Sequence, residues 1–254
     1  MAIYEVTNKT TIAPLFDGWQ ETFIWACLQG YMGNAYADDL HHPQSAQIVV
    51  GDFGLLAGVP NKELARNTRG YQSGFAIIAP QSDAWHAMVE DAWPDAEKRV
   101  RYVTKKEGDI FDREYLRGIV SRLPQGYRMR PIDQEIYTQI LALEWAQDLC
   151  FNFQPYAMYA RYGMGIAALK DGVVVSGASS YVVYRDGIEI EVDTREDEQR
   201  KGLALACSAA LILECLDRGL YPSWDAHNAA SLALAKKLGY RFDREYPVYE
   251  ITEY

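Results

Sequence analysis

The sequence predicts an α/β fold built on a mixed sheet, and three neighbouring segments carry this prediction. Residues 188–194 alternate apolar and acidic side chains, which is the period-two pattern of a strand with one buried face. Residues 203–216 place apolar side chains at helical spacings, so they predict a helix with a wide apolar band. Residues 221–240 add a short strand and a second helix. Alternation of strands and helices in this way is typical of α/β proteins.

The elements before residue 188 follow from the same periodicities and from turn residues. Ser82 and Asp133 each precede a helical pattern and are predicted as N-caps. Helices are expected over residues 20–30, 61–67, 82–91, 112–121 and from 133 to about 148. Strands are expected over residues 46–50, 53–57, 75–79, 99–104, 127–132, 165–169 and 173–184, with hairpin turns at 51–52 and 170–172.

Composition and charge limit the class of protein. The 254 residues are 49% hydrophobic and 24% charged, which predicts a soluble globular protein with no membrane partner. A formal net charge of −10 argues against a nucleic-acid partner and suits a cationic small molecule. The first residues lack the pattern of a signal peptide, so a cytoplasmic location is expected. The four cysteines have no metal-type spacing, and no metal site is predicted.

Residues 199–204 are the segment where a ligand is expected. A helix start carries unpaired backbone N–H groups and a positive partial charge, to which phosphate groups bind. Gly202 has no Cβ, so a ligand's phosphates can approach its backbone, and Arg200 and Lys201 add positive charge. These features predict a polyanionic cofactor at the turn. The alternative is a glycine that starts the helix for packing alone.

The same turn carries a family resemblance. Gln199-Arg200-Lys201-Gly202-Leu203-Ala204 resembles the Gln/Arg-x-x-Gly-x-Gly/Ala motif of the GNAT superfamily of acetyl-CoA-dependent N-acetyltransferases. Asn228 to Ser231, followed by Lys237-Leu238-Gly239-Tyr240, is similar to the second motif of that superfamily. The whole chain is similar to the two-part bacterial subgroup that includes the zwittermicin A resistance protein. The resemblance implies a GNAT acyl-CoA N-acyltransferase fold in the C-terminal half and acetyl-CoA (coenzyme A) as co-substrate.

The resemblance also implies which residues contact the cofactor. In the family, backbone groups of the motif strand hold the pantetheine arm, and the turn and second motif hold the rest. The corresponding residues here are Val192, Asp193, Thr194, Gln199, Arg200, Lys201, Gly202, Leu203, Ala204, Asn228 and Ser231. For Asn228 the alternative of a simple helix N-cap stays open, and both roles are compatible.

Two carboxylates beside the motif strand are candidates for catalysis. An alkyl ammonium must lose a proton before it attacks a thioester, because its pKa lies far above 7. A carboxylate can accept that proton directly or through water. Glu191 is the first candidate and Glu189 the second. A solvated acidic strand face is an equally weighted alternative. Ala235 stands where the family often has a tyrosine, so no general acid is assigned.

The domain organisation is predicted to be two-part. Leu123-Pro124-Gln125-Gly126 interrupts the pattern, which predicts an N-terminal α/β domain over residues 1–125 and a GNAT domain over 126–254. Residues 49–58 and 168–177 share an apolar–turn–apolar–Gly pattern, so the N-terminal half is hypothesised to be a degenerate copy of the same fold. Two ordinary hairpins explain the pattern equally well. The first half lacks a second motif turn, so one cofactor site is expected.

Two functions of different class remain after this reading. The first is an N-acetyltransferase that moves an acetyl group to a primary amine of a small molecule, such as an aminated antibiotic or metabolite, by direct attack in a ternary complex. The second is a non-catalytic acyl-CoA sensor or scaffold, which the missing tyrosine favours. An enzyme that uses a longer acyl group is a third reading. Whether the protein forms a homodimer stays open.

Overall fold

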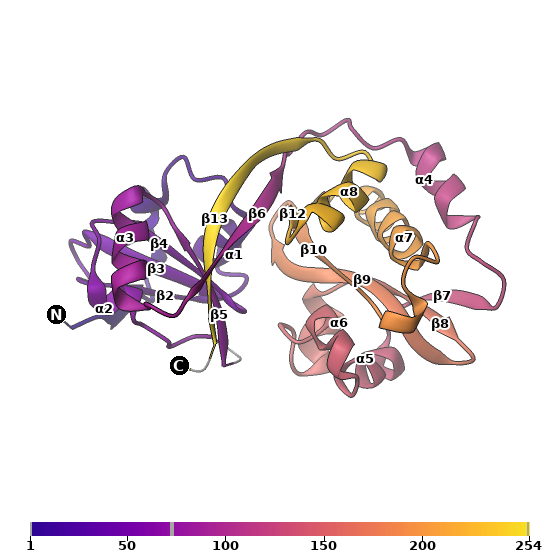
Figure 1. Cartoon of the computed structure of the whole chain (residues 1–254), viewed down its shortest axis with the longest axis horizontal. Helices are drawn as coiled ribbons and strands as arrows, with labels where there is room; N and C mark the ends of the chain where they lie inside the picture. The colour runs from indigo at the N-terminus through magenta and orange to yellow at the C-terminus, as the bar shows by residue number, and fades with distance from the viewer. Residues whose placement is uncertain (1, 72–73, 253) are drawn as a thin grey trace. The chain divides into compact units, whose positions relative to one another are not determined.

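A computed structural model describes residues 2–71, 74–252 and 254 (Figure 1). Compact packing divides the chain into two units, Met1–Arg101 with Glu245–Tyr254 and Tyr102–Arg244. The last residues therefore return to the first unit. The predicted boundary between residues 125 and 126 lies inside the second unit, in the connection between a helix and a strand.

The first unit is built on a mixed sheet. Its strands follow the order β1 (Tyr4–Glu5), β2 (Asn34–Ala37), β3 (Ser45–Val50), β4 (Phe53–Gly58), β5 (Phe75–Pro80) and the end of β13 (Phe242–Thr252). Neighbours are antiparallel except β4 and β5, which are parallel. Its helices are the 3₁₀ helices η1 (Lys9–Thr11) and η2 (Ala13–Phe16), and α1 (Thr22–Leu28), α2 (Lys62–Ala65) and α3 (Asp83–Ala92).

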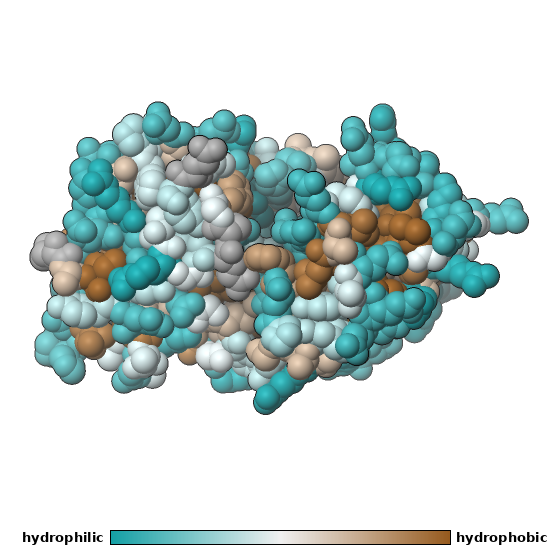
Figure 2. Space-filling view, turned by 90° about the horizontal axis from the view of Figure 1, so that it is seen from below, coloured by the Kyte–Doolittle hydropathy of each residue, from teal (hydrophilic) through white to brown (hydrophobic). Residues whose placement is uncertain are grey.

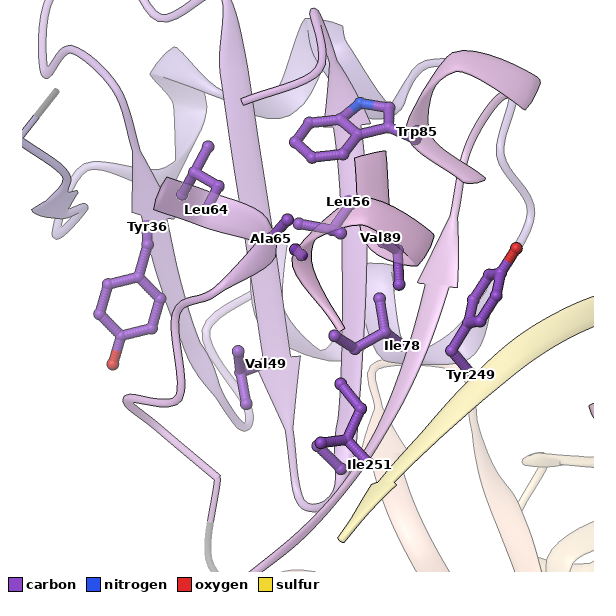
Figure 3. Packing of buried hydrophobic residues seen from close by; sticks show 12 residues of the cluster. Tyr36, Val49, Leu56, Leu64, Ala65, Ile78, Trp85, Val89, Tyr249 and Ile251 are labelled. Carbon is purple, nitrogen blue, oxygen red and sulfur yellow. The ribbon is translucent and has the colours of Figure 1, made fainter. Parts of the chain in front are cut away.

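The core of the first unit lies between this sheet and α2 and α3 (Figure 3). Trp85 of α3 is fully buried, and its indole N–H donates to the Gly58 carbonyl at 2.8 Å. Ile78 of β5 and Ile251 of β13 pack in the same cluster. The C-terminal strand therefore contributes buried side chains to a core that is otherwise made by the first hundred residues, and burial of this apolar area stabilises the return of the chain.

The second unit has a five-stranded sheet. Its order is β11 (Tyr221–Ser223), β10 (Gly187–Thr194), β9 (Val173–Tyr184), β8 (Gly165–Lys170) and β7 (Tyr127–Pro131). All neighbours are antiparallel except β10 and β11, which are parallel. A separate short strand, β12 (Asp225–Ala226), pairs with Tyr102 and Val103 at the end of β6 (Glu97–Thr104).

Helices cover both faces of the five-stranded sheet (Figure 1). One face is covered by α7 (Leu203–Asp217), against which α4 (Arg113–Val120) packs. The other face is covered by α5 (Gln134–Leu141) and the 3₁₀ helix η3 (Glu144–Leu149), with α6 (Tyr156–Tyr162) beside α5. The 3₁₀ helix η4 (Glu196–Glu198) precedes α7, and α8 (Ala229–Lys237) follows β12.

The two units repeat one arrangement of strands. In each, four antiparallel strands are followed by a parallel strand, which the chain reaches through a helix: α2 in the first unit and α7 in the second. A further helix then follows, α3 in the first unit and α8 in the second. This shared order supports the hypothesis that the N-terminal half is a degenerate copy of the C-terminal half.

Most predicted elements are confirmed, and the exceptions have physical causes. The single helix predicted from Asp133 to about Asp148 is wrong. It is α5 followed by η3, because Leu143 takes an extended conformation and lets η3 pack on β9 and β10. Strands β1, β2 and β13 and helix α6 were not predicted. Pro247 and four charged side chains make β13 a poor strand by pattern alone.

The surface agrees with the charged composition. Hydrophilic residues predominate on the face shown in Figure 2, and smaller hydrophobic patches lie between them. Within the part of the chain that the structure describes, no helix is long and apolar enough to cross a bilayer.

Candidate functional site

The parallel strands β10 and β11 of the second unit are paired over three residues only and then separate. Gly187, Ile188 and Glu189 of β10 face Tyr221–Ser223 of β11. Beyond Glu189, no other described strand continues along this side of β10, although β9 pairs along its other side as far as Thr194. The open edge of β10 therefore consists of residues 190–194, and its backbone groups can bind an extended ligand as a neighbouring strand would.

The hydrogen-bond alternation shows which amides face the open edge. The Arg195 N–H donates to the Val175 carbonyl at 3.0 Å, so odd-numbered residues of this segment point their backbone groups toward β9. Val192 then points its N–H toward the open edge. There it donates to the Glu191 carboxylate at 3.0 Å. The Glu191 carboxylate thus accepts the hydrogen bond that the Val192 N–H could otherwise donate to a ligand carbonyl.

Glu189 has a different environment from Glu191. Its side chain is only 5% exposed, and its Oε1 accepts a hydrogen bond from the Asp225 backbone N–H at 2.6 Å. This bond joins β10 to β12 just where β10 and β11 separate. The expectation of a solvated acidic face is therefore wrong for Glu189, because the carboxylate satisfies a backbone donor that the opening would leave unpaired.

The turn before α7 has the conformation that an anion site requires. Arg200 and Gly202 both have positive φ, 60° and 84°. Gly202 is the N-cap of α7, no side chain caps the helix, and a Cβ built at Gly202 would meet nothing within 4 Å. The first intrahelical bond comes from Ala206 to Gly202 at 3.0 Å, so the N–H groups of residues 203–205 have no partner within the helix. Phosphate oxygens can therefore enter the space beside Gly202 and accept hydrogen bonds from these N–H groups.

Two predicted cofactor residues at this turn are engaged with the protein. The Lys201 ammonium donates to Glu198 Oε2 at 2.7 Å and to the Asp197 carbonyl at 2.8 Å. The Gln199 amide donates to the Thr194 carbonyl at 3.4 Å. Arg200 is exposed. Backbone amides and Arg200 are consequently better placed to meet a phosphate than the Lys201 side chain.

The second motif forms a helix cap, as one of its two expected roles requires. Asn228 Oδ1 accepts the Ser231 N–H at 2.9 Å and begins α8. The Ser231 hydroxyl accepts the Trp224 indole N–H at 3.1 Å. Asn228 is exposed, so a ligand can reach it at the start of the helix.

A pair of carboxylates that the sequence did not bring together lies on the η3 face of β10. Asp193 stands opposite Gly177 in the β9–β10 register, and Leu149 of η3 packs where a Gly177 Cβ would lie. The next residue before Leu149 is Asp148. Burial, and then repulsion from Asp148, raises the pKa of Asp193 from 3.8 to about 6. Partial desolvation by neighbouring groups also raises the pKa of Asp148, although this residue is exposed. A carboxylate with such a pKa accepts a proton near neutral pH.

The family resemblance implies a cofactor contact for Asp193, and the helical pattern predicts that a helix ends near Asp148. The 44 residues between them carry no pattern that pairs them. Among the described residues, no group of three or more His, Cys, Asp or Glu side chains is arranged to hold a metal ion.

Comparison with known proteins identifies the class as an N-acetyltransferase. Over 97% of its length the chain is 27% identical to a Bacillus subtilis (strain 168) protein named as an uncharacterized N-acetyltransferase, YdfB, of which it covers 98%. Residues 13–249 match the family described as GNAT acetyltransferase. The chain therefore belongs to the GNAT acetyltransferase family.

Solved structures agree with this membership. A GCN5-related N-acetyltransferase-like protein from Streptococcus suis 89/1591 superposes with a TM-score of 0.91 at 46% identity, over 96% of this chain and 98% of that one. A tandem GNAT protein from the clavulanic acid biosynthesis pathway superposes with a TM-score of 0.59 at 11% identity, over 100% of this chain and 99% of that one. The second likeness concerns the fold alone, and it matches the two-part arrangement seen here.

Proposed function

We propose that the protein transfers an acetyl group from acetyl-CoA to a primary amine of a small molecule, by direct attack in a ternary complex. The observation that carries the proposal is the combination of a bare helix start at α7 with the open edge of β10 that leads to it. A polyanion and an extended amide-containing arm are the two chemical parts that these features fit. Coenzyme A has both.

The proposed donor contacts follow the geometry. The free amides of Leu203 and Ala204, the Gly202 backbone and the Arg200 guanidinium meet the diphosphate. The backbone of Val192, Asp193 and Thr194 holds the pantetheine arm. Gln199 and Lys201 contribute through their backbone, and Asn228 and Ser231 at the start of α8 meet the remainder of the cofactor. Acetyl-CoA supplies the acyl group as an activated thioester.

Glu191 is proposed to accept the proton of the amine. Its carboxylate lies at the Val192 amide, and it becomes available when an acyl carbonyl takes that amide. The amine nitrogen then forms the new C–N bond, the C–S bond breaks, and coenzyme A leaves as thiolate or thiol. The amine proton passes to the carboxylate directly or through water.

Glu189 and Asp193 are proposed to assist. Glu189 is the second candidate for proton transfer, and its bond to Asp225 gives it a further role in holding β12 to β10 where β10 and β11 separate. Asp193, with its raised pKa, is a competing proton acceptor on the η3 side. Both raise the negative charge around the site, which favours a cationic acceptor.

Ala235 is buried at the position of the family tyrosine, so we assign no general acid. The thiolate of coenzyme A has modest basicity and can leave unaided. A non-catalytic acyl-CoA sensor is the alternative function, supported by the same missing tyrosine. Membership of the zwittermicin A resistance subgroup, with an aminated antibiotic as acceptor, and a cytoplasmic location are finer proposals that rest on resemblance.

The first half is proposed to lack a cofactor. Its parallel pair stays closed, since β4 and β5 pair from Phe53 to Leu56 and the Gln81 N–H extends the pairing to the Leu56 carbonyl at 3.0 Å. Its crossover helix, α2, has only four residues and is capped by the Asn61 side chain.

The test is a thiol-release assay with acetyl-CoA and a panel of primary amines. If the protein is an enzyme, the release of free coenzyme A thiol depends on the amine. Glu191→Gln should lower kcat and retain coenzyme A binding as measured by calorimetry. Glu196→Gln, at an exposed acid in η4, is the matched control and keeps wild-type turnover. Tight coenzyme A binding without release on any amine would favour the sensor instead.

A further inference from the structure

A buried acid lies directly behind the cofactor turn. Glu198 of η4 is 1% exposed, although the preceding Glu196 and Asp197 are exposed. An isolated buried carboxylate is costly, so its partners must compensate for lost hydration. Four groups in its surroundings do this, and they come from three separate parts of the second unit.

The partners of Glu198 join the turn to the edge of the sheet. Lys170, the last residue of β8, donates to Oε1 at 2.9 Å, and the Tyr127 hydroxyl at the start of β7 donates to Oε2. Tyr127 and Lys170 face each other in the β7–β8 register, with the Lys170 ammonium 5.6 Å from the centre of the Tyr127 ring. Both side chains are therefore held by the strand pairing while they bind Glu198.

Two basic residues of the turn segment complete the cluster. Lys201 donates to Glu198 Oε2 at 2.7 Å, and Arg195 lies 3.5 Å from Oε1. Arg195 also pairs with Asp197 through two bonds of 2.6 and 3.0 Å. The residues before and after η4 are thus both tied to one carboxylate, and hydrogen bonds from Lys170, Lys201 and Tyr127 lower the pKa of Glu198 to about 2, so it stays ionised in any ordinary assay.

The turn that this cluster holds is strained. Arg200 has a Cβ and yet takes φ of 60°, a left-handed conformation that residues other than glycine rarely adopt. Such conformations persist where the surroundings over-determine them, and they are often functional. Arg200 lies between Lys201, bound to Glu198, and Gln199, bound to the Thr194 carbonyl. Both neighbours of the strained residue are therefore anchored to the protein.

We propose that Glu198 is a positioning residue for the cofactor: together with Tyr127, Lys170 and Lys201 it holds the turn at residues 199–202 so that the first amides of α7 face the phosphates. The inference rests on the proposed function, because it takes coenzyme A as the ligand of the turn. Glu198 itself is buried and does not touch the ligand. The Lys201 side chain acts within this cluster, and Arg200 is left as the cation that the turn presents.

The test compares Glu198→Gln with the wild-type full chain. Coenzyme A binding is measured by calorimetry, and amide hydrogen exchange is measured by mass spectrometry. We expect the Kd to rise about tenfold, which corresponds to about 1.4 kcal/mol. Exchange should accelerate at residues 199–205 and stay unchanged in α8. In an active preparation, KM for acetyl-CoA rises while kcat at saturation stays within about twofold, as expected when only donor binding is weakened.

Two further variants and a control keep the test decisive. Tyr127→Phe removes one hydrogen bond and no charge, so about a threefold rise in Kd is expected. The Kd of Lys170→Met should lie between those of Tyr127→Phe and Glu198→Gln. If Glu198→Gln does not fold, Tyr127→Phe and Lys170→Met serve as the test. Glu214→Gln removes an acid of the same type at the far end of α7, where it pairs with Arg218, and should leave Kd unchanged.

The outcomes separate this inference from the proposed function. If wild-type protein binds no coenzyme A, the proposed function fails. If wild type binds but Glu198→Gln binds equally well, or if exchange accelerates evenly over the whole second unit, Glu198 has only a structural role and the inference is overturned.

Discussion

Replacement of Asp193 with asparagine should stabilise the fold near neutral pH. The pKa of Asp193 is raised from 3.8 to about 6, so the folded state binds this proton more tightly than the unfolded state. The ionised carboxylate therefore destabilises the fold above pH 6, and this cost disappears as the pH falls toward 4. Because the pKa rises by about two, the ionised carboxylate can lower the free energy of unfolding by at most about 3 kcal/mol. Since Asp193 is half-buried and Asp148 is exposed, solvent screening reduces the expected gain to about 1 kcal/mol.

The assay is urea unfolding of Asp193→Asn and wild type at several pH values from 4 to 8. The variant should have the higher free energy of unfolding at pH 7.5, and the difference should vanish toward pH 4. Asp197→Asn is the control with the opposite effect on stability. The Arg195 guanidinium lowers the pKa of Asp197, so loss of this carboxylate should not stabilise the fold at pH 7.5. A variant no more stable than wild type at pH 7.5, or a difference that does not change with pH, would refute the reasoning. A simultaneous loss of turnover would indicate that the destabilising carboxylate serves the reaction.

Three further substitutions test the geometry of the site. Gly202→Ala should lower the free energy of unfolding by about 1 kcal/mol, because alanine resists a φ of 84°, and calorimetry should show weaker coenzyme A binding. Asn228→Ala removes the cap of α8 and should cost about 1 kcal/mol in chemical denaturation; an unchanged midpoint would contradict the cap. Gly187→Ala would place a Cβ 2.2 Å from the Tyr221 carbonyl, so more than about 2 kcal/mol should be lost. Wild-type stability in Gly187→Ala would mean that β10 and β11 are not paired as described.

The local parts of the site could be predicted from sequence because their signals are local. Alternation over residues 188–194 gives the strand, and Gly202 followed by a helical pattern gives the turn and the start of α7. Asn228 is predicted as a helix cap by its type and place, and its side chain forms that cap. Each of these features depends on a few consecutive residues.

The contacts that set the chemistry could not be predicted, because their partners are distant along the chain. Glu189 is buried against the Asp225 amide, and Asp193 is affected by Asp148 on η3. Glu198 looks like one more solvated acid in an acidic run, and only the fold brings Tyr127 and Lys170 to it. Periodicity predicts which face a side chain takes, and it carries no information about which distant group meets it there.

The central claim is that the amides at the start of α7 and on the open edge of β10 bind an acyl-CoA. An NMR titration of ¹⁵N-labelled protein with coenzyme A tests it most directly. The account predicts saturable shifts of the Leu203, Ala204 and Leu205 amides and of the Val192 amide, with α2 of the first unit unaffected. Absence of any saturable shift, or shifts confined to another part of the chain, would contradict it.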